Sequence, residues 1–268
     1  MSQNIKQLKN RIKSVDNTLH LTKAMGLVAS SKIRKATDRM MKGREYESAI
    51  GSMIHTLVAS PECANSPYLA VRPPERTRLV IVAGDRGLAG GYNANIFRLS
   101  RDLTEGAEIT AIGKRAVDRF GGEVIYAEHF TYDQAFTMAK AFCDDYAEGK
   151  FDRLGVICTK YVNVMTQDAV VRWLFPLEKP EGEKARSVVF EPDENTILNT
   201  AIYEYVAGSL VAAVRESFAS EVAARRTAMD SAGKNAQEMI DNLQLEYNRA
   251  RQSSITSEIT EIVAGSGS

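Results

Sequence analysis

The fold depends on a long stretch near the C-terminal end of the chain, residues 211–263, which reads VAAVRESFASEVAARRTAMDSAGKNAQEMIDNLQLEYNRARQSSITSEITEIV. It contains no proline, and Gly233 is its only glycine. A single helix over this range would be about 80 Å long. Such a helix cannot bury an apolar stripe in a compact core, so it requires a partner of similar length. The stripe has steps of three and four residues, at Met229, Ala232, Ala236, Met239 or Ile240, Leu243, Tyr247 and Ala250.

The N-terminal stretch has the matching pattern over more than seven heptads and predicts a helix from Asn4 to Ala59. The side chains in the middle of this seam are small, which lets another backbone approach closely. We therefore expect the two chain ends to pair as a long antiparallel coiled coil; the alternative is two separate amphipathic helices on a globular core. The N-terminal seam consists of Ile5, Leu8, Ile12, Val15, Leu19, Thr22, Gly26, Ala29, Ile33, Ala36, Met40, Gly43, Glu47, Ile50, Ile54 and Leu57.

Between these helices the pattern changes to that of an α/β domain. Residues 60–76 hold four prolines and predict a linker. Beyond it, short β-branched runs alternate with helical segments, which is typical of a Rossmann-like domain with a largely parallel sheet. The chain is thus predicted to consist of an N-terminal coiled-coil helix (1–59), a linker (60–76), a Rossmann-like α/β domain (77–190) and a C-terminal coiled-coil helix (191–268). The predicted strands cover 78–83, 108–112, 123–127, 152–162, 168–175 and 186–190, with the pair 152–162 and 168–175 forming a hairpin, and the predicted helices cover 95–103, 114–120, 132–148 and the stretch after its N-cap, Asp193.

Composition sets the class of protein. The chain has 268 residues, a formal net charge of zero and three scattered cysteines, which suit a reducing compartment and show no metal-ligand spacing. No apolar run has the length of a membrane span, and the heptad pattern begins where a signal peptide would lie.

The charges are unevenly distributed. Residues 1–50 carry eleven Lys and Arg against four Asp and Glu. A basic helix of this kind is suited to nucleic acid, anionic lipid or acidic protein loops, although it is also compatible with a solvated helix face.

Motifs for catalysis are missing from the sequence. The glycines at 84, 87, 90 and 91 follow a predicted strand, but they do not give the G-x-G-x-x-G spacing of dinucleotide-binding turns. The three histidines are far apart, and the acidic pairs fall on helix faces. A nicotinamide-dependent oxidoreductase is thus a weak alternative. A nucleic-acid-binding coiled coil is another, but the chain has no reader motif.

The far end of the C-terminal helix indicates a binding surface. Isoleucines at 255, 259 and 262 extend past the expected overlap with the partner helix, so a molecule outside this chain must cover them. Arg251 and Gln252 precede them and offer hydrogen-bond donors suited to carboxylates.

Three blocks of the sequence resemble the γ subunits of F-type ATP synthases, and together they cover essentially the whole chain. The first is RIKSVDNT at 11–18 with TKAM at 22–25 and VASSKIR at 28–34. The second is DRGLAGGYN at 85–93. The third is YNRARQ at 247–252 with ITSEITEIV at 255–263.

The resemblance implies a central rotating shaft that couples rotation of the c-ring, driven by protons or sodium ions, to sequential conformational change in the catalytic β subunits. Such a subunit is not itself catalytic and holds no cofactor or metal. The implied partners are three α and three β subunits, ε, the c-ring and δ, with no nucleic acid and with membrane contact only through the c-ring. The implied location is the cytoplasmic face of a bacterial inner membrane, or the matrix side of a mitochondrial one.

The resemblance also implies roles for particular residues. Contacts with β subunits fall to Arg251, Gln252, Met25, Lys32, Arg34 and Lys35. The bearing inside the α/β ring falls to Ile255, Ile259, Ile262 and Val263. The side facing the c-ring and ε falls to Glu191, Asp193 and Tyr205.

Overall fold

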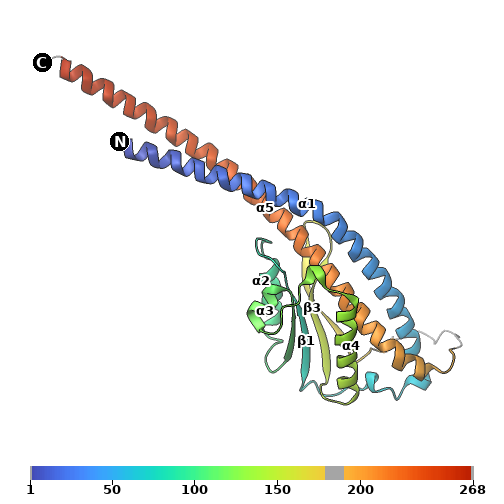
Figure 1. The fold of residues 1–268 in the computed structure, drawn as a ribbon. Coiled ribbons are helices and arrows are strands. Elements are labelled where there is room, and N and C mark those ends of the chain that lie inside the picture. The colour runs from blue at the N-terminus through green and yellow to red at the C-terminus, as the bar shows by residue number, and fades with distance from the viewer. Residues whose placement is uncertain (1, 179–189, 267–268) are drawn as a thin grey trace. The chain divides into compact units, whose positions relative to one another are not determined.

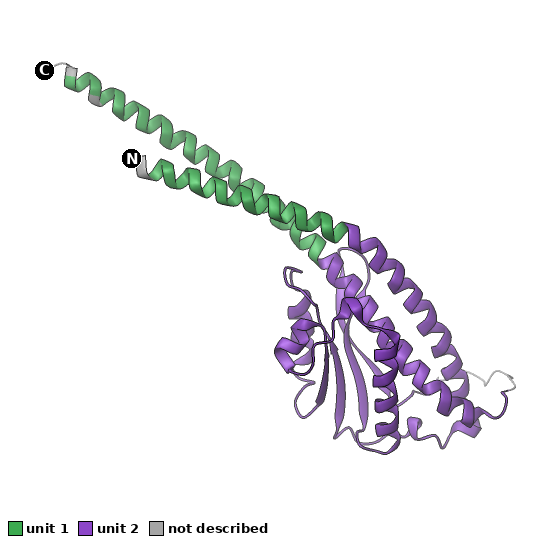
Figure 2. Ribbon diagram, viewed as in Figure 1, with its two compact units in different colours: residues 1–30, 225–268 green, residues 31–224 purple. Residues whose placement is uncertain are grey.

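The computed structural model describes residues 2–178 and 190–266. Two helices dominate it: α1 (Ser2–Val58) and α5 (Glu194–Ser266). The chain divides into two compact units, one formed by residues 1–30 and 225–268 and the other by residues 31–224 (Figure 2). Each long helix contributes to both units, whereas the boundaries predicted from the sequence lie in the linker and before α5. The reason is that parts of α1 and α5 belong to the core of the α/β unit, as described below.

Unit 1 is an antiparallel helix pair (Figure 1). A Cβ on Gly26 would lie 3.4 Å from Asp230 Oδ1 and 3.7 Å from Met229 Cβ, and one on Gly233 would lie 3.6 Å from Thr22 Oγ1. The small residues of the two seams therefore meet, as predicted. All sixteen residues of the N-terminal seam are buried or half-buried, and in the C-terminal seam Ile240, not the exposed Met239, fills the ambiguous position.

Substitutions at Gly26 test this close approach. Gly26→Leu is expected to lower the free energy of unfolding by about 1–3 kcal/mol, because the branches beyond Cβ would have to displace α5. Gly26→Ala is the control: its Cβ makes only ordinary contacts, and alanine favours helix by up to about 1 kcal/mol over glycine. Urea unfolding of the full-length chain measures both. If the leucine variant were as stable as the alanine variant, the helices would not be packed at this position.

Unit 2 is built on a four-stranded sheet with the order β2-β1-β3-β4. The strands β2 (Glu108–Ile112), β1 (Thr77–Val82) and β3 (Arg153–Tyr161) are parallel, and β4 (Gln167–Phe175) pairs antiparallel with β3. The predicted, largely parallel sheet and its hairpin are therefore confirmed.

Helices cover both faces of this sheet. On one face, α2 (Tyr92–Ser100) and α3 (Lys114–Phe120) pack over a core that includes Leu79 and Ile157. On the other, α4 (Tyr132–Ala147) shares a larger core with the ends of α1 and α5 that belong to unit 2 (Figure 1). Ile54 and Leu57 of α1, and most of the buried residues of α5 from Leu198 to Val214, enter this core. The long helices are thus part of the α/β core as well as of the helix pair.

The strand predicted at 123–127 is not formed. The segment is irregular and leads into the short 3₁₀ helix η3 (Ala127–His129). Its backbone accepts one hydrogen bond from the preceding turn, from Gly113 N to Ile125 O at 2.7 Å, and the N–H groups of Ala127 and Glu128 donate to the side chain of Asp85. Gly113 itself has φ +91°, and a Cβ there would overlap Ala83 O, so only glycine fits this turn.

The remaining elements differ little from expectation. The linker contains two short 3₁₀ helices, Pro61–Cys63 and Pro67–Leu69. α2 begins three residues before the predicted start, because Asn95 N already donates to Gly91 O. The strand predicted at 186–190 lies outside the described residues except for Phe190, which is not in a strand. Asp193 caps α5, since its Oδ1 accepts the N–H of Thr196 at 2.8 Å.

One window of α5 is apolar enough to cross a membrane by length and composition, contrary to the sequence-based expectation. However, 67% of that window is buried inside the protein. Burial against the sheet accounts for its apolar character, as in the central helix of a folded domain.

Candidate functional site

The turn after β1, where a Rossmann fold binds phosphate groups, is occupied by the chain's own carboxylate. Glu221 of α5 is 1% exposed, and it accepts the N–H of Asp85 at 3.3 Å and that of Arg86 at 3.2 Å. The preceding N–H, of Gly84, donates to Asn93 Oδ1 at 2.8 Å. The donors that would hold a phosphate in a nucleotide-binding turn are therefore already used.

Asp85 extends this arrangement to the next loop. Its Oδ1 accepts the N–H of Ala127 at 3.0 Å, and its Oδ2 accepts that of Glu128 at 2.9 Å. The two acids, Glu221 and Asp85, join α5, the turn after β1 and η3. Their role is structural, which weighs against the oxidoreductase alternative.

The free end of α5 in unit 1 presents the predicted apolar stripe. The face of α5 toward α1 ends at Ser254, which is buried, and Ser257, which is half-buried. On the other sides, Arg251 and Gln252 are exposed, as are Ile255 at 46%, Ile259 at 55%, Ile262 at 69% and Val263 at 64%. Ile259, Ile262 and Val263 lie beyond the pairing with α1, as the sequence predicted, whereas Arg251, Gln252 and Ile255 lie on the outer side of its last turns. An apolar stripe this exposed is typical of a protein-binding surface.

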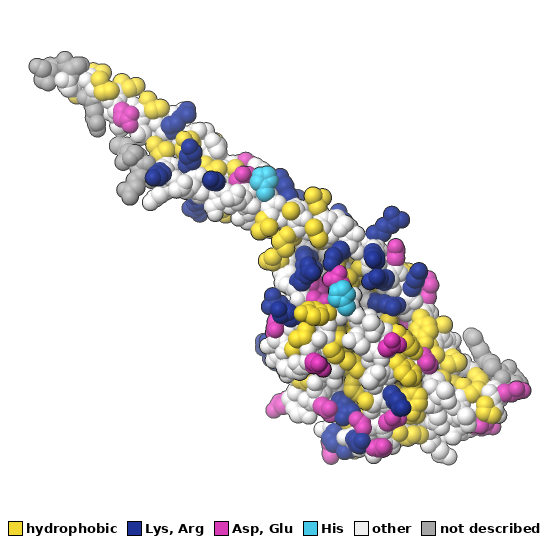
Figure 3. Space-filling view, viewed as in Figure 1, with side chains coloured by type: hydrophobic (Ala, Val, Ile, Leu, Met, Phe, Trp, Pro, Cys, Tyr) yellow, Lys and Arg dark blue, Asp and Glu magenta, His cyan; other side chains and the backbone are white. Residues whose placement is uncertain are grey.

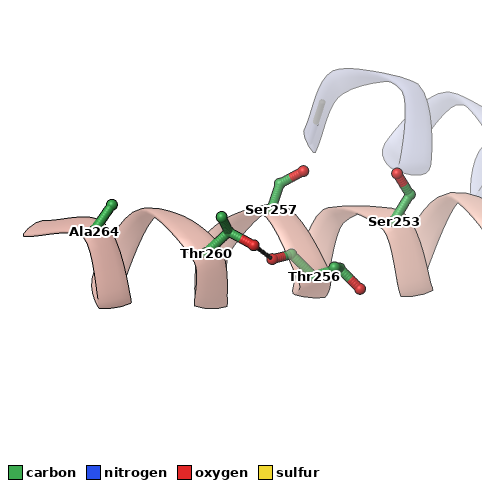
Figure 4. A pocket seen from close by; sticks show the side chains of 5 residues that line it. All are labelled: Ser253, Thr256, Ser257, Thr260 and Ala264. Carbon is green, nitrogen blue, oxygen red and sulfur yellow. Dashed lines mark hydrogen bonds between the residues drawn. The ribbon is translucent and has the colours of Figure 1, made fainter.

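A shallow hollow of about 500 Å³ lies along the same end of α5 (Figure 4). It is lined by Ser253, Thr256, Ser257, Thr260 and Ala264, all from this one helix. Thr260 donates its hydroxyl hydrogen to the backbone oxygen of Thr256 at 2.8 Å, one turn earlier. The described residues of its lining are small and carry no charge.

The residues of α1 that the resemblance assigned to contacts with β subunits differ in their surroundings. Met25 is half-buried. Lys32 donates to Glu128 at 2.6 Å, so this lysine already has a partner within the chain. Burial alone would raise the pKa of Glu128, but the hydrogen bond and charge of Lys32 outweigh it and lower that pKa. Arg34 and Lys35 are exposed, and neither forms an ion pair with a described residue.

The three residues predicted to face the c-ring and ε do not form one surface. Glu191 is exposed, and Asp193 is exposed and caps α5. The hydrogen bonds that Asp193 accepts from Thr196 lower its pKa. Tyr205 instead packs against the core of unit 2 and lies beside Gly51. Burial, and then the charge of Glu47, raise the pKa of Tyr205.

Sequence reasoning missed the acids in the buried part of α5. Glu216 and Glu221 are each 1% exposed, and each satisfies groups from other elements of unit 2. A signal was present in the sequence: both lie in a stretch, residues 211–224, made mostly of apolar and small residues, where a buried acid must find partners. The sequence did not reveal which partners, because they come from residues 44, 85, 86, 161 and 172.

Taken together, the geometry defines an α/β domain inserted between two paired helices, with exposed surfaces suited to binding other proteins. A family model described as ATP synthase matches residues 4–268. A gamma chain of ATP synthase from Ruminococcus albus is 39% identical, and one from Psychrobacter cryohalolentis is 37% identical, each over 98% of both chains. The chain belongs to the family of ATP synthase gamma chains.

Solved structures show the same fold at lower sequence identity. A chain of the Euglena gracilis mitochondrial ATP synthase, in a structure described as OSCP/F1/c-ring, is similar with a TM-score of 0.69 at 17% identity, covering 98% of this chain and 94% of that one. A chain of the Tetrahymena thermophila mitochondrial ATP synthase, in a structure described as central stalk/c-ring, is similar with a TM-score of 0.62 at 21% identity, covering 79% and 99%.

Proposed function

We propose that this chain is the central rotating shaft of an F-type ATP synthase and is not itself catalytic. It couples rotation of a proton- or sodium-driven c-ring to sequential changes in three catalytic β subunits. Its partners are three α and three β subunits, ε, δ and the c-ring. It meets the membrane only through the c-ring, on the cytoplasmic face of a bacterial inner membrane or the matrix side of a mitochondrial one.

The observation that carries the proposal is the paired helices of unit 1, with α5 continuing alone beyond α1. Such a helix pair differs from one side to another, so subunits placed around it meet different side chains. Shifting the ratio of open to closed β by about 10⁴ requires roughly 5.5 kcal/mol of differential contact energy. A few charge-assisted hydrogen bonds supply energy of this size.

The exposed residues take different parts in this scheme. Arg251 and Gln252 bind a loop of one β subunit, and Met25 lies close to the β loops. Arg34 and Lys35 contact acidic loops of β. Lys32 also contacts such a loop, and to do so it either binds Glu128 and the loop together or breaks its hydrogen bond to Glu128. The apolar stripe at Ile255, Ile259, Ile262 and Val263 serves as a bearing, because apolar contacts have little directional preference.

The side toward the c-ring and ε involves Glu191 and Asp193, both exposed next to the start of α5. Tyr205 contributes to this side by fixing the end of α5 on the core of unit 2.

Isolation of the complex tests the proposal. A tagged full-length chain, purified from detergent-solubilised membranes of cells that express it, is expected to bring down α, β, ε and c subunits in fixed ratios. Recovery of the chain alone, or with nucleic acid in place of these subunits, would contradict it.

A further inference from the structure

A basic pocket lies in unit 2, between α1, α5 and η3. Its volume is about 440 Å³, and none of its lining residues is among those assigned above to contacts with other subunits. The floor is largely apolar, with Ala36, Ala127 and Phe218. The rim carries three cationic side chains, Arg39, Lys42 and Arg215, with His129 beside them. Figure 3 shows Lys and Arg side chains gathered on this unit.

The positive charges of the pocket are not compensated within it. Glu128 is the single acid among the lining residues, and it is already bonded to Lys32 at 2.6 Å. Among the described residues, no carboxylate forms an ion pair with Arg39, Lys42 or Arg215. Three other half-buried arginines of this unit differ: Arg44 pairs with Glu216, Arg78 with Glu108 and Asp145, and Arg172 with Glu47 and Glu216.

Among the three cationic side chains of the pocket, Arg215 is the most buried. It is half-buried, and its Cδ would lie 3.5 Å from a Cβ on Gly43, so its alkyl chain crosses α1 where that helix has no side chain. Burial, and then the charge of Arg39, lower the pKa of Arg215. A desolvated guanidinium next to a second one is unfavourable without an anion, and an anion that entered would relieve this cost.

We propose that this pocket binds a phosphate group, either free inorganic phosphate or the phosphate of a small ligand such as a nucleotide. Two guanidinium groups present forked donors that match phosphate oxygens, and Lys42 adds a point charge. Three uncompensated positive charges favour a dianion over a single carboxylate. The site goes beyond the coupling role proposed above and does not depend on it.

Titration calorimetry of the full-length chain tests the site, with inorganic phosphate, pyrophosphate and ATP as separate probes. We expect saturable binding of one phosphate group per chain. Arg215→Gln and Arg39→Gln should each weaken it about tenfold or more, because each removes charge-assisted hydrogen bonds. The matched control is Arg101→Gln, which removes an exposed arginine of the same unit that does not line the pocket. Tighter binding of ATP or pyrophosphate than of phosphate would identify a phosphorylated ligand, and equal binding would identify free phosphate.

Three results would overturn the proposal. One is no saturable binding of any probe to a chain whose circular dichroism shows it to be folded. Another is equal weakening by Arg101→Gln and Arg215→Gln, which would indicate general charge attraction. The third is tighter binding of a polyglutamate peptide than of all three phosphate probes, with the same sensitivity to Arg215→Gln, which would assign the pocket to an acidic protein segment.

Discussion

Replacing Glu216 with alanine is expected to lower the free energy of unfolding by about 3–5 kcal/mol, the usual cost of removing one partner from a buried ion pair. Glu216 is 1% exposed and accepts hydrogen bonds from Arg44 at 2.5 Å and from the N–H of Tyr161 at 2.9 Å. It also accepts one from Arg172. Without this acid, two guanidinium groups that join α1, α5 and β4 lose their shared partner. The midpoint of urea unfolding of the full-length chain measures the loss.

Glu216→Gln is the matched control, since it keeps the shape and an acceptor but removes the charge. Its loss should be smaller than that of Glu216→Ala. If both variants unfolded at the wild-type midpoint, the buried network would not stabilise this unit.

The same residue predicts a dependence on pH. Burial alone would raise the pKa of Glu216, but hydrogen bonds and charges from Arg44 and Arg172 outweigh it, so the folded pKa lies below the ordinary value of 4.5. The stabilisation by its charge is therefore present above pH 4.5 and is lost as the pH falls through the folded pKa. The difference in stability between wild type and Glu216→Gln should shrink over this acid range. A difference that stayed constant down to complete unfolding would show that the Glu216 charge is not the cause.

Replacing both Arg251 and Gln252 with alanine is expected to lower ATPase activity of the assembled complex, coupled to ion pumping, by about tenfold. Both side chains are exposed in unit 1 and lie past most of the pairing with α1. Under the proposed function they donate to a β loop, and a charge-assisted hydrogen bond contributes about 1.5–3 kcal/mol, where 1.4 kcal/mol is a factor of ten. Rates of ATP hydrolysis and of ion pumping by reconstituted complex measure the effect.

The matched control is Lys234→Ala with Gln237→Ala, which also removes one cation and one amide from exposed positions of α5. It should leave coupled activity near wild type. Both double variants must assemble to the same yield and unfold at the same midpoint. Full coupled activity in well-assembled Arg251/Gln252 variant complex would contradict the assignment of these two residues.

The sequence predicted the long helices and their pairing because this information is local and periodic. The step of three and four residues identifies which side of α1 is buried, and glycine at 26 and 233 marks where backbones approach. Elements of the α/β unit were also predicted from local sequence. The strand β2 and the helix α3 have the predicted bounds, since each is a short apolar or amphipathic run next to Gly113. The exposed stripe at the end of α5 followed from the length of its pattern beyond that of α1.

The parts that escaped prediction depend on contacts between distant segments. The apolar run at 123–127 looks like a strand, but the Asp85 carboxylate takes the N–H groups of Ala127 and Glu128 in place of a neighbouring strand. The basic pocket likewise combines Arg39 with Arg215, which are far apart in the sequence. For the same reason, the division of α1 and α5 between two units could not be read from linker composition.

Rotation of single molecules tests the central claim most directly. The three native cysteines are buried, so Glu105→Cys, in an exposed loop of unit 2, gives a selective site for a probe. With the proposed ring of α and β subunits fixed to a surface, addition of ATP should turn the probe in one direction, with three dwell positions per turn if the ring holds the three β subunits of the proposal. ATP hydrolysis at the normal rate while the probe stays still, or moves without direction, would contradict the account.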